Sequence, residues 1–221
     1  MSERPEHLVD GLWRWTARHP EWHPGEFGKE VASFAADLGE QLVLVDPLLP
    51  GEPTATLQDL DDLAAGRRIH IVMTIPYHVR SAEPLSERYD AEIWGHPAAA
   101  KRLGSRRRFR VLEPGRSTPP NLDAVHIGRP RRHEMPILIP AHRAVAFGDA
   151  VVEVDGELRM WSTSVVDERR AAWYRERFAP TLEPLLDHDV DRVLVTHGQP
   201  ILHGGRDALA AALAARPLDP R

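Results

Sequence analysis

The 221-residue sequence contains no cysteine, and its only lysines are at positions 29 and 101. Without cysteine the chain cannot form disulfides, use a thiolate nucleophile or bind zinc through sulfur. Any chemistry must therefore depend on His, Asp, Glu, Tyr and Arg. The scarcity of Lys beside frequent Arg, Ala, Pro and Gly is typical of a protein from a high-GC bacterial genome.

Long apolar runs and a basic excess are also missing. No apolar stretch approaches the roughly 18 residues that a membrane span needs, and the opening MSERPEHLVDG lacks the basic and apolar segments of a secretory signal. The net charge of −5 disfavours a nucleic-acid binder, because such domains usually carry a basic excess. We therefore expect a cytoplasmic protein with no membrane partner and no nucleic-acid partner.

The composition is that of an ordinary soluble globular protein, with 42% hydrophobic and 28% charged residues. No stretch is typical of a linker between domains, so residues 1–221 are expected to form a single domain.

Apolar periodicity predicts a chain of strands interrupted by helices. The predicted strands are 12–15, 31–38, 41–45, 69–74, 91–96, 122–128, 135–140, 143–154, 157–161 and 190–196, with a hairpin turn at Asp155-Gly156. The predicted helices are 54–66, 97–104, 167–188 and 204–215, and Pro180 and Pro184 are expected to bend or break the third. This order predicts two sheets with helices outside them.

The stretch IHIVMTIPYHVRSAEPL, residues 69–85, has an unusual composition where a buried strand ends. Pro76, Tyr77, His78 and Arg80 fall within five positions. Strand ends are where α/β proteins keep their functional side chains, because a rigid sheet aims loop residues into a shared crevice. The stretch is therefore a candidate site.

Several segments together resemble the metallo-β-lactamase-fold superfamily. The matching segments are LVLVDPLLP as a sheet-edge strand with its Asp, IVMT as the strand before the first metal motif, IPAHRAVAFGDAVV with the bridging Asp, and VLVTHGQPILHGG with the last His. The resemblance covers roughly residues 8–215. It implies an α/β fold, an αββα sandwich of two mixed β-sheets flanked by helices.

The resemblance also implies a dinuclear zinc site whose first motif reads T-H-x-H-x-D-H after the strand. Thr74 is present, but the four ligand positions after it fall on Ile75, Tyr77, Val79 and Arg80. Shifting the alignment by one residue places only His78 on a ligand position. In the family a further His ligand precedes the strand that corresponds to MPILIP. That position falls on Pro130 here, with His133 three residues later.

Two family ligands remain, the bridging Asp149 and the last His197. Because zinc sites use at least three protein ligands, these two residual positions are too few to bind zinc tightly. The dinuclear site is therefore expected to be absent.

Two functional hypotheses follow. The first is a non-catalytic or metal-independent homologue that needs no cofactor and binds an anionic or acyl small molecule. Its predicted cleft residues are Asp46, Tyr77, His78, Arg80, Asp149 and His197. Within this hypothesis, the Arg80 guanidinium is expected to pair with Asp149 where zinc would bridge.

The second hypothesis is a metal-dependent hydrolase with a rewired mononuclear zinc site. Its predicted ligands are His78, His133, Asp149 and His197. The basic run RPRR at 129–132 is expected to be mainly solvated loop charge, although it lies near the predicted cleft and is suited to holding an anion. The sequence assigns no catalytic residue.

Overall fold

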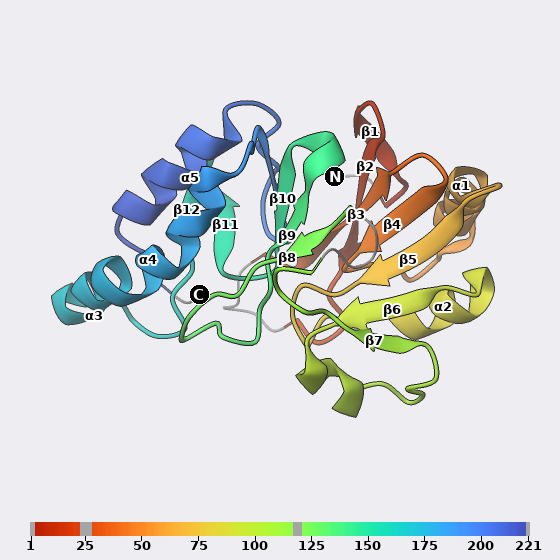
Figure 1. Cartoon of the computed structure of the whole chain (residues 1–221), viewed down its shortest axis with the longest axis horizontal. Coiled ribbons are helices and arrows are strands. Elements are labelled where there is room, and N and C mark those ends of the chain that lie inside the picture. Colours follow the sequence, from red (N-terminus) through yellow and green to blue (C-terminus); the bar gives the residue numbers. More distant parts are fainter. Residues whose placement is uncertain (1–2, 23–27, 117–120, 220–221) are drawn as a thin grey trace.

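The computed structural model describes residues 3–22, 28–116 and 121–219, which form two principal β-sheets with helices on both outer sides (Figure 1). The larger sheet follows sequence order: β1 (Glu6–Val9), β2 (Leu12–Arg18), β3 (Glu30–Asp37), β4 (Gln41–Val45), β5 (Arg68–Val72), β6 (Glu92–Gly95) and β7 (Phe109–Val111). Strands β1 to β4 pair antiparallel and β4 to β7 pair parallel, so this sheet is mixed.

The second sheet is also mixed. Its order is β13 (Arg192–Val195), β10 (Ala144–Phe147), β9 (Ile137–Ile139) and β8 (Asp123–Ala124), with only β10 and β13 parallel. A separate hairpin pairs β11 (Val151–Val154) with β12 (Glu157–Met160). Asp155 and Gly156 both have positive φ at its turn, which confirms the predicted hairpin.

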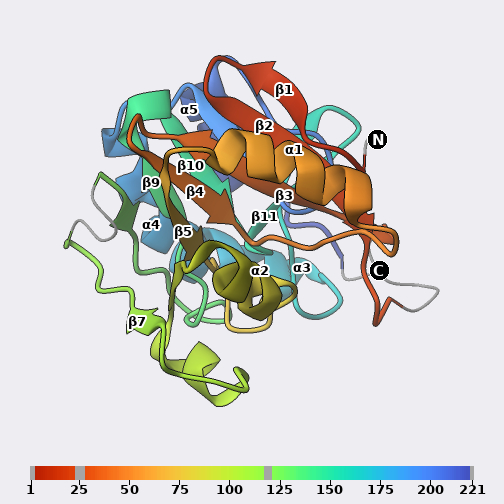
Figure 2. The same cartoon turned by 90° about the vertical axis from the view of Figure 1, so that its right-hand side faces the viewer.

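Helices cover the outer face of each sheet. The helices α1 (Thr54–Ala64) and α2 (Ala82–Tyr89) lie on the seven-stranded sheet (Figure 2), and α3 (Glu168–Trp173), α4 (Ala179–Leu182) and α5 (Gly205–Ala214) lie on the opposite side of the molecule. The predicted helix 167–188 is broken into α, π, α and 3₁₀ segments, as expected where Pro180 and Pro184 remove N–H donors. The αββα sandwich is therefore confirmed.

Strand periodicity explains the layers. In β4, Leu42 and Leu44 pack toward α1 and α2, whereas Val43 and Val45 pack between the sheets. Successive residues of a strand point to opposite faces, so a strand buried on both faces reads as a continuous apolar run. The fold therefore has one core between the sheets and one under each helical layer.

Two expectations about the elements were wrong, and three elements were not predicted. The predicted strand 143–154 is divided at Gly148 into β10 and β11, which belong to different sheets. Strand β4 lies inside the larger sheet between β3 and β5 and is not an edge strand. Strand β1, helix α2 and strand β7 were not predicted. Strand β1 is short with no buried residue, α2 carries a proline and few apolar residues, and β7 is a short strand with two of its three residues exposed.

Within the part of the chain that the structure describes, no helix combines the length and the apolarity that crossing a bilayer requires.

Candidate functional site

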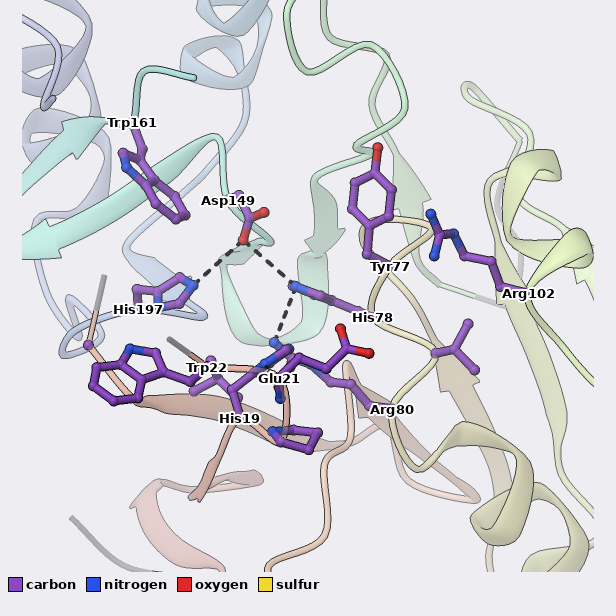
Figure 3. Close-up of a pocket in the computed structure, with 14 residues that line it drawn as sticks. His19, Glu21, Trp22, Tyr77, His78, Arg80, Arg102, Asp149, Trp161 and His197 are labelled. Carbon is purple, nitrogen blue, oxygen red and sulfur yellow. Dashed lines mark hydrogen bonds and ion pairs between the residues drawn. The ribbon is translucent and has the colours of Figure 1, made fainter. Parts of the chain in front are cut away.

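The predicted cleft residues come from the ends of four strands. Asp46 follows β4, His78 and Arg80 lie in the loop after β5, Asp149 lies between β10 and β11, and His197 lies just beyond β13. Figure 3 shows His78, Asp149 and His197 pointing toward one another. Asp46 and Asp149 both lie within 4 Å of His78, so the two carboxylates face the 75–80 loop from the same end of the sandwich.

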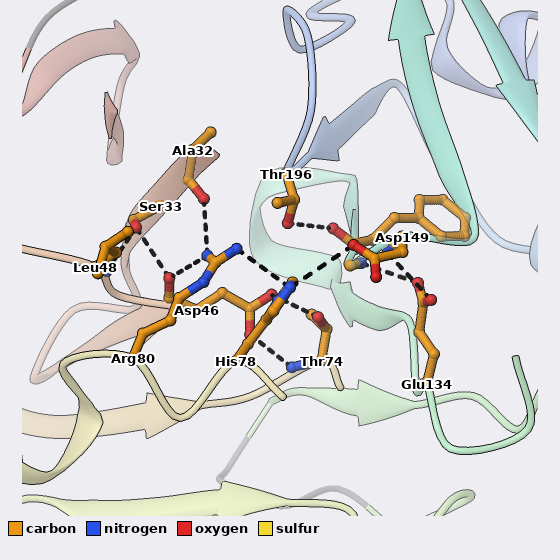
Figure 4. Close-up of polar contacts among 12 residues, drawn as sticks. Ala32, Ser33, Asp46, Leu48, Thr74, His78, Arg80, Glu134, Asp149 and Thr196 are labelled. Atoms are coloured by element: carbon orange, nitrogen blue, oxygen red, sulfur yellow. Dashed lines mark hydrogen bonds and ion pairs between the residues drawn. The ribbon is translucent and has the colours of Figure 1, made fainter. Parts of the chain in front are cut away.

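Asp46 is the buried centre of a hydrogen-bond network (Figure 4). Its side chain is 3% exposed. Its Oδ1 accepts from the Thr74 backbone N–H at 2.8 Å, and its Oδ2 accepts from Thr74 Oγ1 at 2.5 Å and from His78 Nδ1 at 2.8 Å. Because a carboxylate only accepts, the Nδ1 of His78 must carry a proton.

The Arg80 guanidinium contacts Nε2, the other ring nitrogen of His78. The Arg80 backbone φ of +40° is in the left-handed region, and the guanidinium donates to the carbonyl oxygens of Asp46 at 2.9 Å and Ala32 at 3.4 Å. The same group contacts His78 Nε2 at 3.2 Å. Since guanidinium has no acceptor, it is the donor in this contact, and the lone pair of His78 Nε2 accepts.

The expected Arg80–Asp149 ion pair is wrong. Among the described residues Arg80 makes no ion pair within 4.0 Å, and Arg131 is the cation that contacts Asp149, at 3.1 Å. The Arg131 side chain is 12% exposed and lies over the Trp161 ring at 5.1 Å. Arg131 is therefore not a solvated loop charge. The cation that neutralises Asp149 comes from the segment 129–132, which was expected to be mainly solvated.

A double-mutant cycle tests this assignment. Arg131→Ala and Asp149→Ala should show a coupling free energy of about 2 kcal/mol in denaturant unfolding, because removing either partner leaves a poorly solvated charge unpaired. The exposed pair Arg143–Asp189 should show no measurable coupling. Stronger coupling between Arg80 and Asp149 than between Arg131 and Asp149 would contradict the assignment.

The turn that carries Asp149 is held by a residue that the sequence did not single out. The buried Glu134 carboxylate accepts from the backbone N–H groups of Gly148, Asp149 and Ala150 at 2.9 to 3.1 Å. A Cβ on Gly148 would lie 2.5 Å from Ile75 and 2.7 Å from Thr74 Oγ1, so only glycine allows this close approach. The turn and the 74–75 segment are therefore packed together, which brings Asp149 to His78.

Burial changes the titration of three groups here. Burial and the nearby Asp149 charge raise the pKa of Glu134 to about 7. Burial lowers the pKa of His197 to about 4. Burial alone would raise the pKa of Asp149, but the guanidinium charges of Arg131, in contact with it, and of nearby Arg80 oppose burial and hold that pKa below its usual range.

His78, Asp149 and His197 lie at the floor of a cleft of about 680 Å³, within the range of small-molecule sites. Its walls include His19, Trp22, Tyr77, Arg102 and Trp161. Tyr77 is 57% exposed, and the Arg102 guanidinium lies 4.6 Å from its ring centre. Of the predicted cleft residues Tyr77, His78, Arg80, Asp149 and His197 line this space, whereas Asp46 lies behind His78 and supports it.

The predicted mononuclear site is not assembled. His133 packs its ring against His96 at 4.9 Å and lines a neighbouring cavity of about 200 Å³. Asp149 Oδ1 lies 3.7 Å from both His78 Nε2 and His197 Nε2, wider than the roughly 3.4 Å between ligands of a tetrahedral zinc. In residues 3–22, 28–116 and 121–219, no group of three or more His, Cys, Asp or Glu side chains is arranged to hold a metal ion.

Known proteins share the fold but not the sequence. No protein-family model matches the chain, and no curated protein matches it. Solved structures do match: a metallo-β-lactamase from Erythrobacter litoralis with β-mercaptoethanol in the active site has a TM-score of 0.62 and 14% identity, covering 95% of this chain and 94% of that one. The chain has the metallo-β-lactamase fold.

Two further structures give the same result. The DIM-1 metallo-β-lactamase exposed to ceftazidime has a TM-score of 0.64 at 12% identity, with 96% of each chain covered. A β-lactamase domain protein from Burkholderia ambifaria has a TM-score of 0.67 at 16% identity, covering 97% of this chain and 76% of that one. At these identities the likeness concerns the fold alone.

The residues of this metallo-β-lactamase fold do not fit the zinc ions that the fold family implies. The imidazole nitrogen of His78 that faces the cleft already accepts from Arg80, and Oδ2 of Asp149 already accepts from Arg131. A metal ion would have to displace one guanidinium and would lie close to two fixed cations.

Proposed function

We propose that this protein binds a small organic anion in its cleft without a metal ion and does not hydrolyse it. The observation that carries the proposal is the contact of Arg80 with His78 Nε2 at 3.2 Å. A metal ion or a proton in the cleft would need the lone pair of that nitrogen. Arg80 and Arg131 take the charge-neutralising role that zinc has in the fold family.

The protonation of the cleft groups supports binding without catalysis. A general base works best when its pKa lies near the operating pH. The pKa of His197 is about 4 and that of Asp149 is held low, so both are weak bases at neutral pH.

Metal analysis is the first test. Protein purified without chelator should contain far less than one zinc, iron or manganese per chain, and EDTA should change its melting temperature by less than about 1 °C. A tightly bound metal would add about 4 kcal/mol, so its removal would lower the melting temperature by roughly 8 °C or more. One metal per chain, lost with such a drop, would contradict the proposal.

Ligand binding is the second test. EDTA-treated protein should bind and be stabilised by at least one of octanoate, 2-naphthoate and 2-naphthyl phosphate in calorimetry and thermal melts. Absence of binding to all three at millimolar concentration would contradict anion binding.

A mononuclear metal hydrolase is the second candidate function, because His78, Asp149 and His197 do converge. It requires Arg80 to leave His78 and a further ligand in place of His133. The metal analysis separates it from the first proposal, since it demands one metal per chain and activity that EDTA abolishes.

A further inference from the structure

Arg102 differs from the other arginines around the cleft. Arg80 and Arg131 are engaged by internal acceptors, whereas the exposed Arg102 makes no side-chain hydrogen bond or ion pair within the described residues. Its guanidinium lies over the Tyr77 ring at 4.6 Å. Stacking uses the face of a guanidinium and leaves its in-plane N–H donors available, which is the geometry that binds a carboxylate in a bidentate manner.

The other side of the cleft presents indole rings. Figure 3 shows Trp161 and His197 across the cleft from Tyr77 and Arg102. The Arg131 guanidinium lies 5.1 Å from the centre of the Trp161 ring, and the His197 ring packs against Trp161 in a T-shaped arrangement with the ring centres 5.3 Å apart. With Trp22, it forms an aromatic wall of the same cavity. Such a wall favours a planar apolar group on the ligand.

The charges of the lining select the charge of the ligand. Asp149 is neutralised by Arg131, which leaves Arg80, Arg102 and Glu21 as the other charged groups of the lining. Their net charge of +1 suits a single negative charge better than the double charge of a phosphate monoester.

We propose that the cleft binds an aromatic monocarboxylate, with its carboxylate on Arg102 and its ring against Trp161 and Trp22. This rests on the proposed function and narrows the anion to one chemical class. The ligand spans the cleft above His78, Asp149 and His197, which form its floor.

The test uses EDTA-treated full-length protein and four probes. 2-Naphthoate has the charge and the ring, 2-naphthalenemethanol has only the ring, decahydro-2-naphthoate has the charge on a saturated frame, and 2-naphthyl phosphate carries a second charge. Calorimetry and tryptophan quenching should rank 2-naphthoate tightest, with the alcohol at least tenfold weaker and the saturated acid several-fold weaker.

Two matched variants locate the carboxylate. Arg102→Gln should weaken 2-naphthoate about tenfold and leave the alcohol within twofold. Lys101→Gln removes an adjacent exposed cation that does not line the cleft, so it should change the affinity for neither 2-naphthoate nor the alcohol. Melting temperatures of both variants check that they fold.

The other possible results contradict either the ligand class alone or anion binding as a whole. If Arg102→Gln leaves 2-naphthoate binding unchanged, or if the phosphate or the saturated acid binds more tightly, the aromatic monocarboxylate class is wrong while anion binding stands. If no anionic probe binds, both this inference and the proposed function are wrong.

Discussion

Replacing Asp46 with Ala should lower the free energy of unfolding by about 4 kcal/mol, a large part of the 5–15 kcal/mol that stabilises an ordinary domain. The Asp46 carboxylate accepts from the N–H and O–H of Thr74 and from the N–H of His78, all in the interior. An unsatisfied buried donor costs about 1–3 kcal/mol, and the costs of neighbouring donors overlap.

The positive φ of Asp46 adds a backbone cost to Asp46→Ala, and Asp155→Ala is the control for that cost. Asp46 has a φ of +46°, which Asp tolerates better than Ala. Asp155 has a similar φ of +53° at the exposed β11–β12 turn, with no side-chain partner among the described residues. Asp155→Ala should therefore cost about 1 kcal/mol from the backbone alone.

Asp46→Asn should fall between the two variants, because its amide oxygen still accepts from Thr74 while its NH₂ group faces the His78 N–H. Urea unfolding of the three variants measures the series. Equal losses for Asp46→Ala and Asp155→Ala would show that the buried network adds nothing to stability. In that case Asp46 would not be what positions His78.

The second large expected effect is a pair of opposite pH dependences. In the folded state the pKa of Glu134 is raised from 4.5 to about 7, so between these values the folded state holds a proton that the unfolded state releases. Stability from this group is present below pH 4.5 and is lost as the pH rises to 7, by about 3 kcal/mol.

His197 has the reverse effect. Its pKa is lowered from 6.5 to about 4 in the folded state, so between these values the unfolded state holds the extra proton. Stability from His197 therefore rises by about 3 kcal/mol as the pH rises from 4 to 6.5. The two contributions nearly cancel between pH 4.5 and 6.5 in the native protein.

Single substitutions should separate the two contributions. Relative to the native protein, the unfolding free energy of Glu134→Gln should gain a positive slope of about 1.4 kcal/mol per pH unit between pH 4.5 and 6.5, and that of His197→Gln a negative slope of the same size. Urea unfolding at pH 4.5, 5.5 and 6.5 measures both. Variant curves parallel to the native curve would mean that neither group has a shifted pKa, whatever the absolute stabilities.

Much of the fold could be predicted because its core strands are buried on both faces. Strand segments such as LVLV at 42–45 and VLV at 193–195 read as apolar runs from sequence alone. The error at 143–154 has a local cause: apolar residues lie on both sides of Gly148 and Asp149 and read as one strand, while the chain turns there in close contact with Ile75.

The site was predictable to the extent that it lies at strand ends. Asp46, His78, Asp149 and His197 follow β4, β5, β10 and β13 or their turns, and parallel strands bring their carboxyl ends to one edge. Arg131 and Glu134 were missed because they lie in an irregular loop rich in Arg and Pro. Nothing in such a loop indicates which side chains turn inward.

The sequence by itself determined the αββα sandwich and the end at which polar side chains gather, and it predicted that the four zinc-ligand positions after Thr74 fall on Ile75, Tyr77, Val79 and Arg80. The tertiary structure alone decided which charges meet. The left-handed backbone of Arg80 directs its guanidinium to His78 and to two carbonyl oxygens, and loop packing leaves Arg131 to pair with Asp149. Apolar periodicity is a local property of the chain, whereas the pairing of buried charges depends on long-range packing and loop dihedral angles that no local pattern specifies.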